Sequence, residues 1–297
     1  MNIGGNAVPA KDSRRTRVII ALLAVYTTWS TTYLAIKFAL ESFPPFFLAG
    51  LRYFIVGLVL FVYLRFKGHP APNRSQWAGT VAVGGLLLVG GNGGVSYAQQ
   101  WVASGIAAMV VGSTPIWTVL FSGIWREWPR RLEWAGLAVA FGGLLLLNAG
   151  GELRAYPAAA AALVAAVASW SFGSAWSKRL SLPQGLMAGA SQMLAGGALL
   201  LLASVVVGEH MSAAPSARSV VALLYLSVFG SLVGYSAYVY LLKHVRASLA
   251  TSYAYVNPVL AVLLGIWLAN ERLSGPEVAA MAAILSGVVL VVMAQRK

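Results

Sequence analysis

Long apolar runs separated by short polar connections organise this chain. A helix rises about 1.5 Å per residue, so roughly 20 apolar residues cross the ~30 Å hydrocarbon core of a bilayer. Ten segments approach that length, at 18–40, 46–66, 78–99, 105–125, 133–150, 157–177, 184–207, 219–242, 248–269 and 277–294. The pattern predicts an all-α integral membrane protein with ten transmembrane helices.

Composition and charge agree with a membrane setting. Hydrophobic residues make up 59% of the chain and charged residues 10%, against roughly 25% charged in soluble domains. The net charge of +13 would suit nucleic acid only if the basic residues formed one patch, and they fall in small groups between apolar runs. We therefore expect a lipid bilayer and no nucleic acid as partner. There is no cysteine, and we expect neither a metal nor another cofactor.

The basic residues predict the orientation. With the N-terminus inside, sixteen lysines and arginines fall in cytoplasmic connections and three, Arg154, Arg218 and Arg272, fall outside. Positive charge is retained in the cytoplasm. Both termini are therefore expected to be cytoplasmic, including basic segments at 1–17 and 295–297.

The second half of the chain repeats the first. Trp29-Ser30 aligns with Trp170-Ser171 at an offset of 141, and Gly91, Pro115 and Gly143 align with Gly234, Pro258 and Gly287 at similar offsets. This predicts two copies of a five-helix unit, 18–150 and 157–294, joined by a linker at 151–156. Because five is odd, the second copy enters the membrane from the opposite side, as an inverted repeat.

Several stretches resemble a known family. "WSTTYLAIK" (29–37), "LAGLRYF" (48–54), "GSTPIWTVL" (112–120), "YVNPVLAVLL" (255–264) and "ANERLSGPEVAAMAAILSGVVLV" (269–291) are similar to the EamA repeats of the drug/metabolite transporter superfamily. The strongest resemblance is to its YddG-type amino-acid exporters. The resemblance implies a multi-pass exporter of the bacterial inner membrane, with a central cavity between the repeats. One departure is that Arg52 is matched by Ser191 and has no counterpart in the second repeat.

Polar and aromatic faces on the equivalent first and sixth helices are candidates to line that cavity. Helical spacing places Tyr26, Trp29, Ser30 and Tyr33 on one face, and a polar face inside a membrane must point at protein or water. Alternatively, the hydroxyls bond their own backbone and the rings pack. The predicted substrate-binding residues, mainly from helices 1, 3, 4, 6, 8 and 9, are Tyr26, Trp29, Ser30, Tyr33, Asn92, Trp170 and Asn257. The fifth and tenth helices carry few polar groups and are expected to be peripheral.

Pro115 and Pro258 each fall near the middle of a predicted helix. Proline removes a backbone hydrogen bond and frees the carbonyl four residues earlier, so both residues are candidate hinges or kinks beside the cavity. A simpler interpretation is a tolerated kink in which Thr114 or Asn257 satisfies the freed groups.

Of the 21 lysines and arginines, only Lys37 and Arg52 fall inside predicted helices and away from the connections. Lys37, near the outer end of the first helix, either extends its ammonium to the interface or contacts a substrate carboxylate. Arg52 lies deeper, and Glu41 in the connecting loop is its expected partner, so that these two form a structural ion pair.

No Asp, Glu or His falls at mid-membrane, so no ordinary proton carrier is available there. Positive charge alone in the membrane favours carboxylate-bearing solutes, and facilitated export of amino acids, aromatic ones included, or related small metabolites by alternating access is the preferred function. A broad exporter of drugs or quaternary cations, acting through cation-π contacts, is the main alternative. An integral-membrane enzyme lacks a catalytic base other than Lys37, so no enzyme is expected; a structural protein would not explain the repeated polar faces. The oligomeric state is open, with a monomer favoured.

Overall fold

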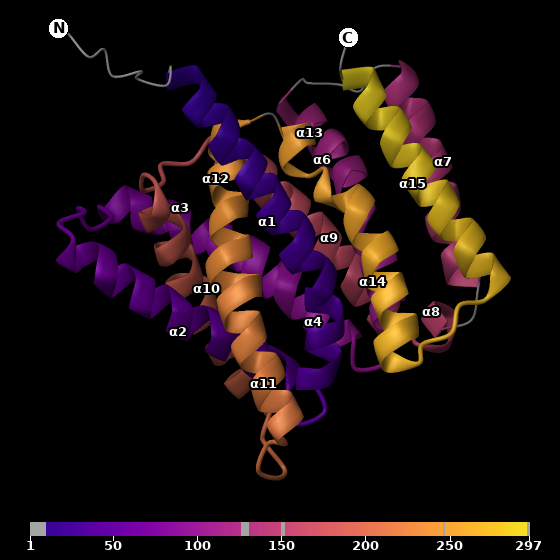
Figure 1. The fold of residues 1–297 in the computed structure, drawn as a ribbon, viewed down its shortest axis with the longest axis horizontal. Coiled ribbons are helices and arrows are strands. Elements are labelled where there is room, and N and C mark those ends of the chain that lie inside the picture. The colour runs from indigo at the N-terminus through magenta and orange to yellow at the C-terminus, as the bar shows by residue number, and fades with distance from the viewer. Residues whose placement is uncertain (1–9, 126–130, 150–151, 246, 296–297) are drawn as a thin grey trace, which may run out of the picture.

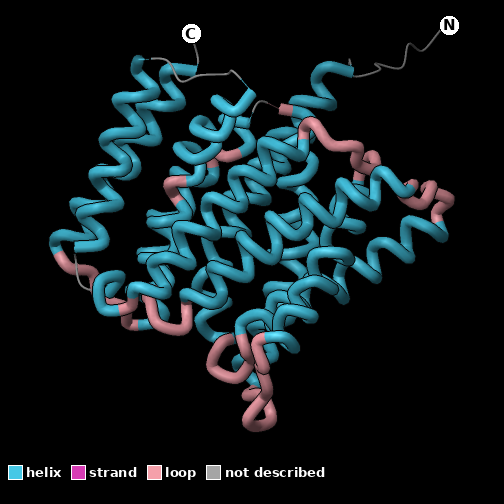
Figure 2. The backbone as a smooth tube through the Cα atoms, turned by 180° about the vertical axis from the view of Figure 1, so that it is seen from behind, coloured by secondary structure: helices cyan, strands magenta, loops and turns pink. Residues whose placement is uncertain are grey.

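The protein is a bundle of helices. The computed structural model describes residues 10–125, 131–149, 152–245 and 247–295, and no strand occurs in these ranges. The first turn of α1 and the last turn of α15 lie at the same edge of the bundle, whereas the turn before α11 lies at the opposite edge (Figure 1). Loops gather at these two ends and helices fill the space between them (Figure 2). Residues 1–9 and 296–297, which are parts of the basic segments predicted at 1–17 and 295–297, lie outside the described residues. The loop arginines Arg126, Arg130 and Arg246 also lie outside them.

The first half of the chain contains five apolar segments, and the third and fourth of these are each divided into shorter helices. Two local signals set helix starts: Pro45 begins α2, and Asn73 and Gln76 form a reciprocal capping box at the start of α3. The elements are α1 (Ala10–Ala39), α2 (Pro45–Phe66), α3 (Arg74–Gly84), η1 (Gly85–Gly93), α4 (Gly94–Ala98), α5 (Ser104–Val111), α6 (Thr114–Ser122), η2 (Gly123–Trp125) and α7 (Arg131–Ala149).

The second half repeats this order. After the short α8 (Glu152–Ala155), Pro157 begins α9 and Ser216 caps α11 by accepting from the Ser219 amide. The remaining elements are α9 (Pro157–Ser177), α10 (Leu186–Val206), α11 (Ala217–Tyr225), η3 (Leu226–Tyr235), α12 (Ser236–His244), α13 (Ala247–Ala250), α14 (Tyr253–Ala269) and α15 (Gly275–Gln295).

Equivalent helices of the two halves pack against each other, as α2 does with α10 and α7 with α15. The contacts between α7 and α15 are reciprocal: Gly143 faces Ile284, and its counterpart Gly287 faces Ala140. Residue numbers rise along one helix as they fall along the other, so the pair is antiparallel. Equivalent helices that run in opposite directions are the relationship that an inverted repeat requires.

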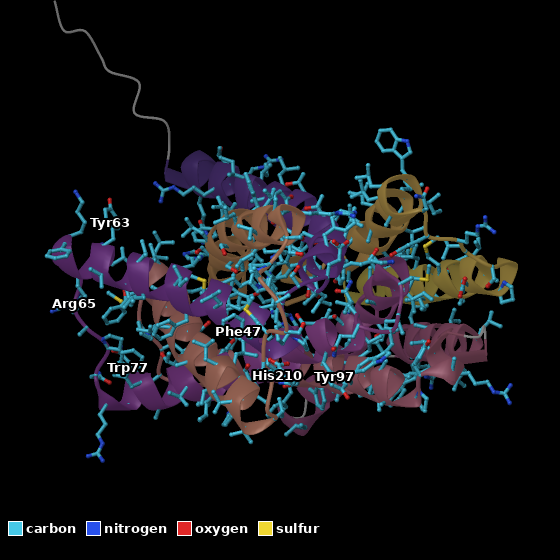
Figure 3. The ribbon with its side chains drawn as sticks, turned by 90° about the horizontal axis from the view of Figure 1, so that it is seen from below. Phe47, Tyr63, Arg65, Trp77, Tyr97 and His210 are labelled. Carbon is cyan, nitrogen blue, oxygen red and sulfur yellow. The ribbon has the colours of Figure 1, made fainter. Side chains whose placement is uncertain are left out.

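Within the described ranges, six helical stretches are long and apolar enough to cross a membrane, and shorter apolar helices accompany them. The six are Arg14–Ala39, Pro45–Phe66, Arg74–Ala98, Pro157–Ser177, Leu186–Val206 and Ala217–His244. Tyr63, Arg65 and Trp77 lie near the tip of the α2–α3 hairpin, away from the centre of the bundle (Figure 3). Aromatic and basic side chains commonly mark the edge of the hydrocarbon. The count of ten crossings stays a prediction.

Irregular backbone occurs at equivalent places in the two halves. The third predicted segment contains the π-helix η1, and the eighth contains the π-helix η3. Periodicity in the sequence gave no sign of either. Wider helical turns of this kind concentrate at functional sites in proteins.

The two prolines differ in their surroundings. Instead of a kink within one helix, the fourth segment breaks after Val111, and α6 restarts at Thr114 with Pro115 in its first turn. Pro258 stays inside α14, and its ring lies so close to Gly112 that a Cβ there would be 2.9 Å from Pro258 Cγ. Thr114 Oγ1 donates to the Val111 carbonyl over 2.6 Å, as the simpler interpretation of Pro115 expected.

Candidate transport site

A layer of aromatic side chains crosses the middle of the bundle, where both halves meet. Trp29 on α1 lies with its ring centroid 5.4 Å from that of Trp170 on α9, 5.0 Å from Tyr238 and 4.9 Å from Tyr253. Most of these pairs are edge-to-face, an arrangement that the ring quadrupoles favour. We call these four residues the aromatic layer.

Hydrogen bonds and glycines fix the two indoles. Trp29 Nε1 donates to the Gly230 carbonyl over 3.2 Å, and Trp170 Nε1 donates to the Tyr238 hydroxyl over 3.1 Å. Trp29 lies against Gly234 of η3, and Trp170 lies against Gly91 of η1. Each indole therefore rests on a glycine in the π-helix of the other repeat, where any side chain would collide with it.

A central cavity of about 60 Å³ adjoins the aromatic layer. It lies at the junction of the repeats, and residues of η1, η3 and the α5–α6 break contribute to its wall. The lining comprises Trp29, Thr32, Tyr33, Ile36, Arg52, Tyr53, Gly91, Asn92, Val95, Val111, Thr114, Ala166, Val167, Trp170, Gly230 and Tyr253. None of these belongs to α7 or α15, which pack together at one edge of the bundle (Figure 1).

Of the predicted substrate-binding residues, Trp29, Tyr33, Asn92 and Trp170 line this cavity. The other three lie in hydrogen bonds between α1 and the region of α14. Ser30 Oγ donates to Asn257 Oδ1 over 2.9 Å, and both side chains are buried. The Tyr26 hydroxyl and Ser252 Oγ are 2.6 Å apart. Ser30, Asn257 and Tyr26 thus hold two helices together beside the cavity.

The structure corrects the predicted pairing of Arg52 with Glu41. Glu41 Oε1 lies 3.3 Å from Arg218 Nη1, at the start of α11, with both side chains well exposed. Arg52 is 2% exposed, and its Nη2 donates to Asn92 Oδ1 over 3.0 Å. Arg52 lies about 10 Å along α2 from Pro45, and at that depth its guanidinium meets Asn92 of η1 instead of Glu41.

Lys37 forms an ion pair that sequence reasoning did not predict. Its Nζ lies 2.7 Å from Glu271 Oε1, and Lys37 is not among the described residues that line the central cavity. Asn270, in a left-handed conformation at φ 52°, ends α14 and turns the chain so that Glu271 points back at the bundle. Glu271 also accepts from the backbone amides of Ser104 and Gly105 at the N-terminus of α5. The carboxylate therefore ties α1, α5 and the end of α14 together.

Burial alone would raise the pKa of the Glu271 carboxyl, but the hydrogen bonds from Lys37 and Ser104 and the lysine charge outweigh it. The pKa of Glu271 consequently lies below its ordinary value. The group is ionised at neutral pH, so the ion pair with Lys37 is intact there.

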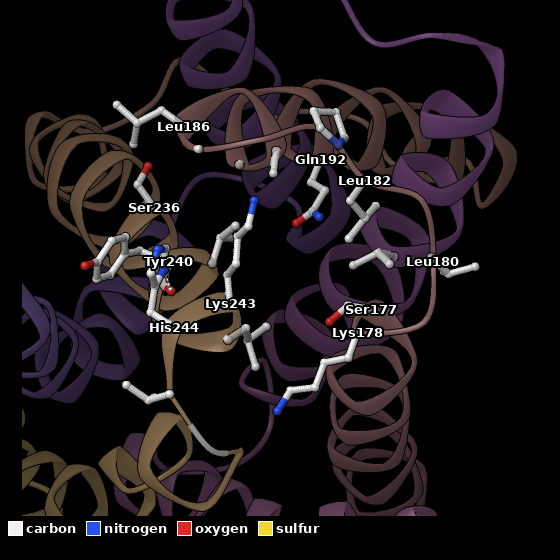
Figure 4. Close-up of a pocket in the computed structure, with 18 residues that line it drawn as sticks. Ser177, Lys178, Leu180, Leu182, Leu186, Gln192, Ser236, Tyr240, Lys243 and His244 are labelled. Carbon is white, nitrogen blue, oxygen red and sulfur yellow. Dashed lines mark hydrogen bonds between the residues drawn. The ribbon is translucent and has the colours of Figure 1, made fainter. Parts of the chain in front are cut away.

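A second, larger cavity of about 540 Å³ lies at the end of the bundle where α9 and α12 finish. Lys178 and Lys243 enter it from different helices, with His244, Ser236 and Gln192 nearby (Figure 4). Gln192 Oε1 accepts from the Tyr235 hydroxyl over 2.9 Å, and the Tyr235 ring packs against Tyr53 of the central cavity. Gln192 and Tyr235 therefore stand between the two cavities. By the predicted orientation this basic cavity faces the cytoplasm.

Sequence reasoning missed several residues of the central cavity, among them Thr32, Tyr53, Gly230 and Tyr253. Tyr53 follows Arg52 directly, and its depth in the helix could have marked it. Gly230 and Tyr253 gave no signal, because their roles come from contacts with α1 and α9 and not from a pattern on their own helices.

Comparison with known proteins places the chain in a family. The sequence profile of the EamA-like transporter family matches residues 16–149 and 157–293. An uncharacterized inner membrane transporter of Escherichia coli strain K12, YedA, is 44% identical over 272 residues, which cover 91% of this chain and 89% of that protein. The WAT1-related protein At3g02690, a chloroplastic protein of Arabidopsis thaliana, is 27% identical over 91% of this chain and 68% of its own length. One crystal structure superposes with a TM-score of 0.69 at 24% identity, covering 95% of this chain and 99% of that one, and shows the same fold. With its two matching repeats, the chain belongs to the EamA-like transporter family and is a multi-pass membrane transporter.

Proposed function

We propose that this protein exports amino acids, or related small metabolites that carry a carboxylate, across the bacterial inner membrane. The observation that carries the proposal is the central cavity, which both repeats build and which the aromatic layer adjoins. Substrate sites of inverted-repeat transporters lie at the repeat interface near the bilayer midplane. On this proposal the chain crosses the membrane ten times, with both termini in the cytoplasm.

Alternating access fits the arrangement of the two cavities. Gln192, Tyr235 and the aromatic layer separate the basic cavity from the central one. At about 60 Å³ the central cavity has room for about two waters, so a whole amino acid enters only when aromatic side chains move apart. The π-helices and the α5–α6 break supply backbone that can adjust at this depth.

We propose that transport is facilitated and is not driven by protons. Of the described residues that line the central and basic cavities, none is an aspartate or glutamate. Proton-driven antiport commonly uses an acidic side chain along the path. Solute would therefore move down its own gradient.

Export of aromatic or quaternary cations is the second candidate. The aromatic layer offers ring faces of the kind that bind such cations. Arg52 argues against this candidate, because a guanidinium in the cavity wall repels a cationic solute.

Counterflow into liposomes tests the proposal. Purified protein would be reconstituted, the vesicles loaded with unlabelled L-alanine, L-phenylalanine or tetraethylammonium, and uptake of the labelled compound measured. We expect exchange of at least one amino acid and none of tetraethylammonium. Exchange of tetraethylammonium alone would establish the second candidate. Accumulation of an amino acid against its gradient, abolished by an uncoupler, would contradict the facilitated mechanism.

A further inference from the structure

Arg52 is a buried cation without an ionic partner. Its relative exposure is 2%, and among the described residues no carboxylate lies within ion-pair distance of it. Asn92 Oδ1 accepts one of its hydrogen bonds, and the guanidinium carbon lies 4.5 Å from the centre of the Tyr53 ring. The buried Nε–H has no acceptor among the residues that the structure describes. Arginine has five N–H donors, so most of its capacity is unused.

A charge held in this way is costly inside a membrane. Burial removes the hydration of the guanidinium, and only a paired opposite charge with good hydrogen bonds compensates for that loss. One neutral amide oxygen and one ring face do not provide a full opposite charge. An apolar side chain of similar length would pack at this position without that penalty. The arrangement therefore calls for an anion that is not part of the described chain.

The central cavity is where such an anion has access. Arg52, Tyr53 and Asn92 are all in its wall. Asn92 uses its oxygen to accept from Arg52, which leaves its Nδ2 as a further donor beside the guanidinium. Carboxylates match the planar guanidinium fork with two parallel hydrogen bonds. The cavity's volume of about 60 Å³ is suited to a carboxylate group.

The basic cavity supports the same charge preference. Lys178, Lys243 and His244 lie along its wall, and of the described residues that line it none is acidic (Figure 4). A concave site lined by one sign of charge raises the local concentration of the opposite ion. Anionic groups are thus attracted toward the wall that Gln192 and Tyr235 form, with Arg52 beyond it.

We infer that Arg52, with the Asn92 amide, binds the carboxylate of the transported solute in the central cavity. The inference rests on the proposed function and deepens it. It replaces the structural role expected for Arg52 and transfers the carboxylate contact from Lys37, whose ammonium is paired with Glu271. Arg52 then determines specificity, by selecting solutes with an acidic group.

Binding of matched ligands tests the inference. L-alanine and L-alanine amide differ in the carboxylate, and isothermal titration calorimetry on purified protein measures the binding of each. We expect the wild type to prefer the acid by at least about tenfold, as a charge-assisted hydrogen-bond pair provides. Arg52→Gln should reduce this preference to about twofold or less, and its affinity for L-alanine amide should equal that of the wild type. Arg65→Gln, on the exposed end of the same helix, is the matched control and should behave as the wild type. An undiminished preference in Arg52→Gln would overturn the inference.

Asn92→Asp keeps the test decisive if Arg52→Gln does not fold. The new carboxylate would lie within hydrogen-bond distance of Arg52 and neutralise it from inside the chain. We expect this variant to be at least as heat-stable as the wild type and to lose the preference for the acid. A stable Asn92→Asp protein that still prefers L-alanine would reject the carboxylate role of Arg52.

Failure of the proposed function is detected separately. If counterflow shows exchange of neither L-alanine nor L-phenylalanine, amino-acid export is wrong. Propionate and propionamide, compared as thermal stabilisers at equal ionic strength, then test Arg52 by itself. Stabilisation by propionate in the wild type and not in Arg52→Gln supports an anion site for other carboxylates. Equal responses of the two proteins to propionate refute it. Equal stabilisation by chloride and propionate would show a site for small anions in general and would also contradict a carboxylate-specific role.

Discussion

Trp29 and Trp170 meet edge-on at the centre of the molecule, with ring centroids 5.4 Å apart and planes at 79°. They are equivalent residues of the two repeats, and each rests on a glycine of the opposite repeat's π-helix, Gly234 for Trp29 and Gly91 for Trp170. The pair thus lies close to the pseudo-twofold axis that relates the repeats. Under the proposed alternating access, a motion that opens one end of the bundle would change the contact between these two rings.

Gly91→Ala and Gly234→Ala should each impair transport. A Cβ on Gly91 would lie 2.8 Å from the Trp170 ring, and one on Gly234 would lie 2.4 Å from Trp29 Nε1. The indole must shift, and for Trp29 the hydrogen bond to the Gly230 carbonyl is strained. Overpacking of this kind costs about 1–3 kcal/mol. Counterflow rate and thermal midpoint in detergent would be measured together.

Gly142→Ala is the matched control. Gly142 lies in α7 and a Cβ there meets nothing within 4 Å. Replacing a mid-helix glycine by alanine should stabilise this helix by up to about 1 kcal/mol and leave transport unchanged. If Gly91→Ala and Gly234→Ala behaved as Gly142→Ala does, the indole contacts would have no part in transport.

Features confined to one helix were predictable, and features that join two helices mostly were not. The spacing of Trp29 and Tyr33 places them on one face, and the repeat supplies Trp170 as the partner of Trp29. The ion pair of Lys37 with Glu271 joins residues 234 positions apart. No periodicity indicates which of several loop acids a lysine meets.

The error about Arg52 has the same physical origin. Glu41 is near Arg52 in sequence, but Arg52 lies about two turns into α2, where Asn92 of η1 accepts a hydrogen bond from its guanidinium. The π-helices themselves left no sign, because their composition of glycine and leucine is also that of ordinary membrane helices. The apolar segments and the duplication were readable because each depends on residue type alone.

The ion pair of Lys37 with Glu271 should make stability depend on pH. The pKa of Glu271 is lower in the folded chain than its ordinary value, so the ionised carboxylate stabilises the fold above the unfolded-state pKa of about 4.3. This contribution is lost as the pH falls through the folded-state pKa. Glu271→Gln should therefore lower the thermal midpoint at pH 7 and have a smaller effect at an acidic pH below the folded-state pKa.

Glu41→Gln serves as the comparison for Glu271→Gln. Its partner Arg218 is exposed, with side-chain exposures of 55% and 43% for the arginine and the glutamate. Exposed ion pairs contribute about 0–1 kcal/mol and are screened by salt. Glu41→Gln should leave the midpoint nearly unchanged at both pH values. A loss for Glu271→Gln that did not diminish at acidic pH would show that packing, and not charge, supports this contact.

Lys243→Gln should weaken uptake of carboxylate solutes from the cytoplasmic side. Lys243 lines the basic cavity, and its charge acts through solvent on an incoming anion. Such an interaction is worth about 0.5–1 kcal/mol, so KM should rise roughly two- to fivefold at low salt with kcat nearly unchanged. The increase in KM should shrink in high salt.

Lys67→Gln, at the α2–α3 turn, removes the same charge outside either cavity and should have no effect on KM. A salt-independent rise in KM would assign Lys243 a direct contact instead.

Thr114 should be needed for the break that precedes Pro115. Its Oγ1 donates to the Val111 carbonyl over 2.6 Å, at the point where α5 ends. Without that hydroxyl the carbonyl of the half-buried Val111 would lose this hydrogen bond, which costs about 0.5–1.5 kcal/mol. Thr114→Val keeps the side-chain shape and should lower the thermal midpoint, whereas Thr114→Ser keeps the hydroxyl and should retain most of the stability.

Since both Val111 and Thr114 line the central cavity, Thr114→Val should also slow counterflow at equal protein in the vesicles. Equal stability of the valine and serine variants would mean that the Val111 carbonyl finds another donor, and the α5–α6 break would then owe its stability to Gly112 and Pro115 alone.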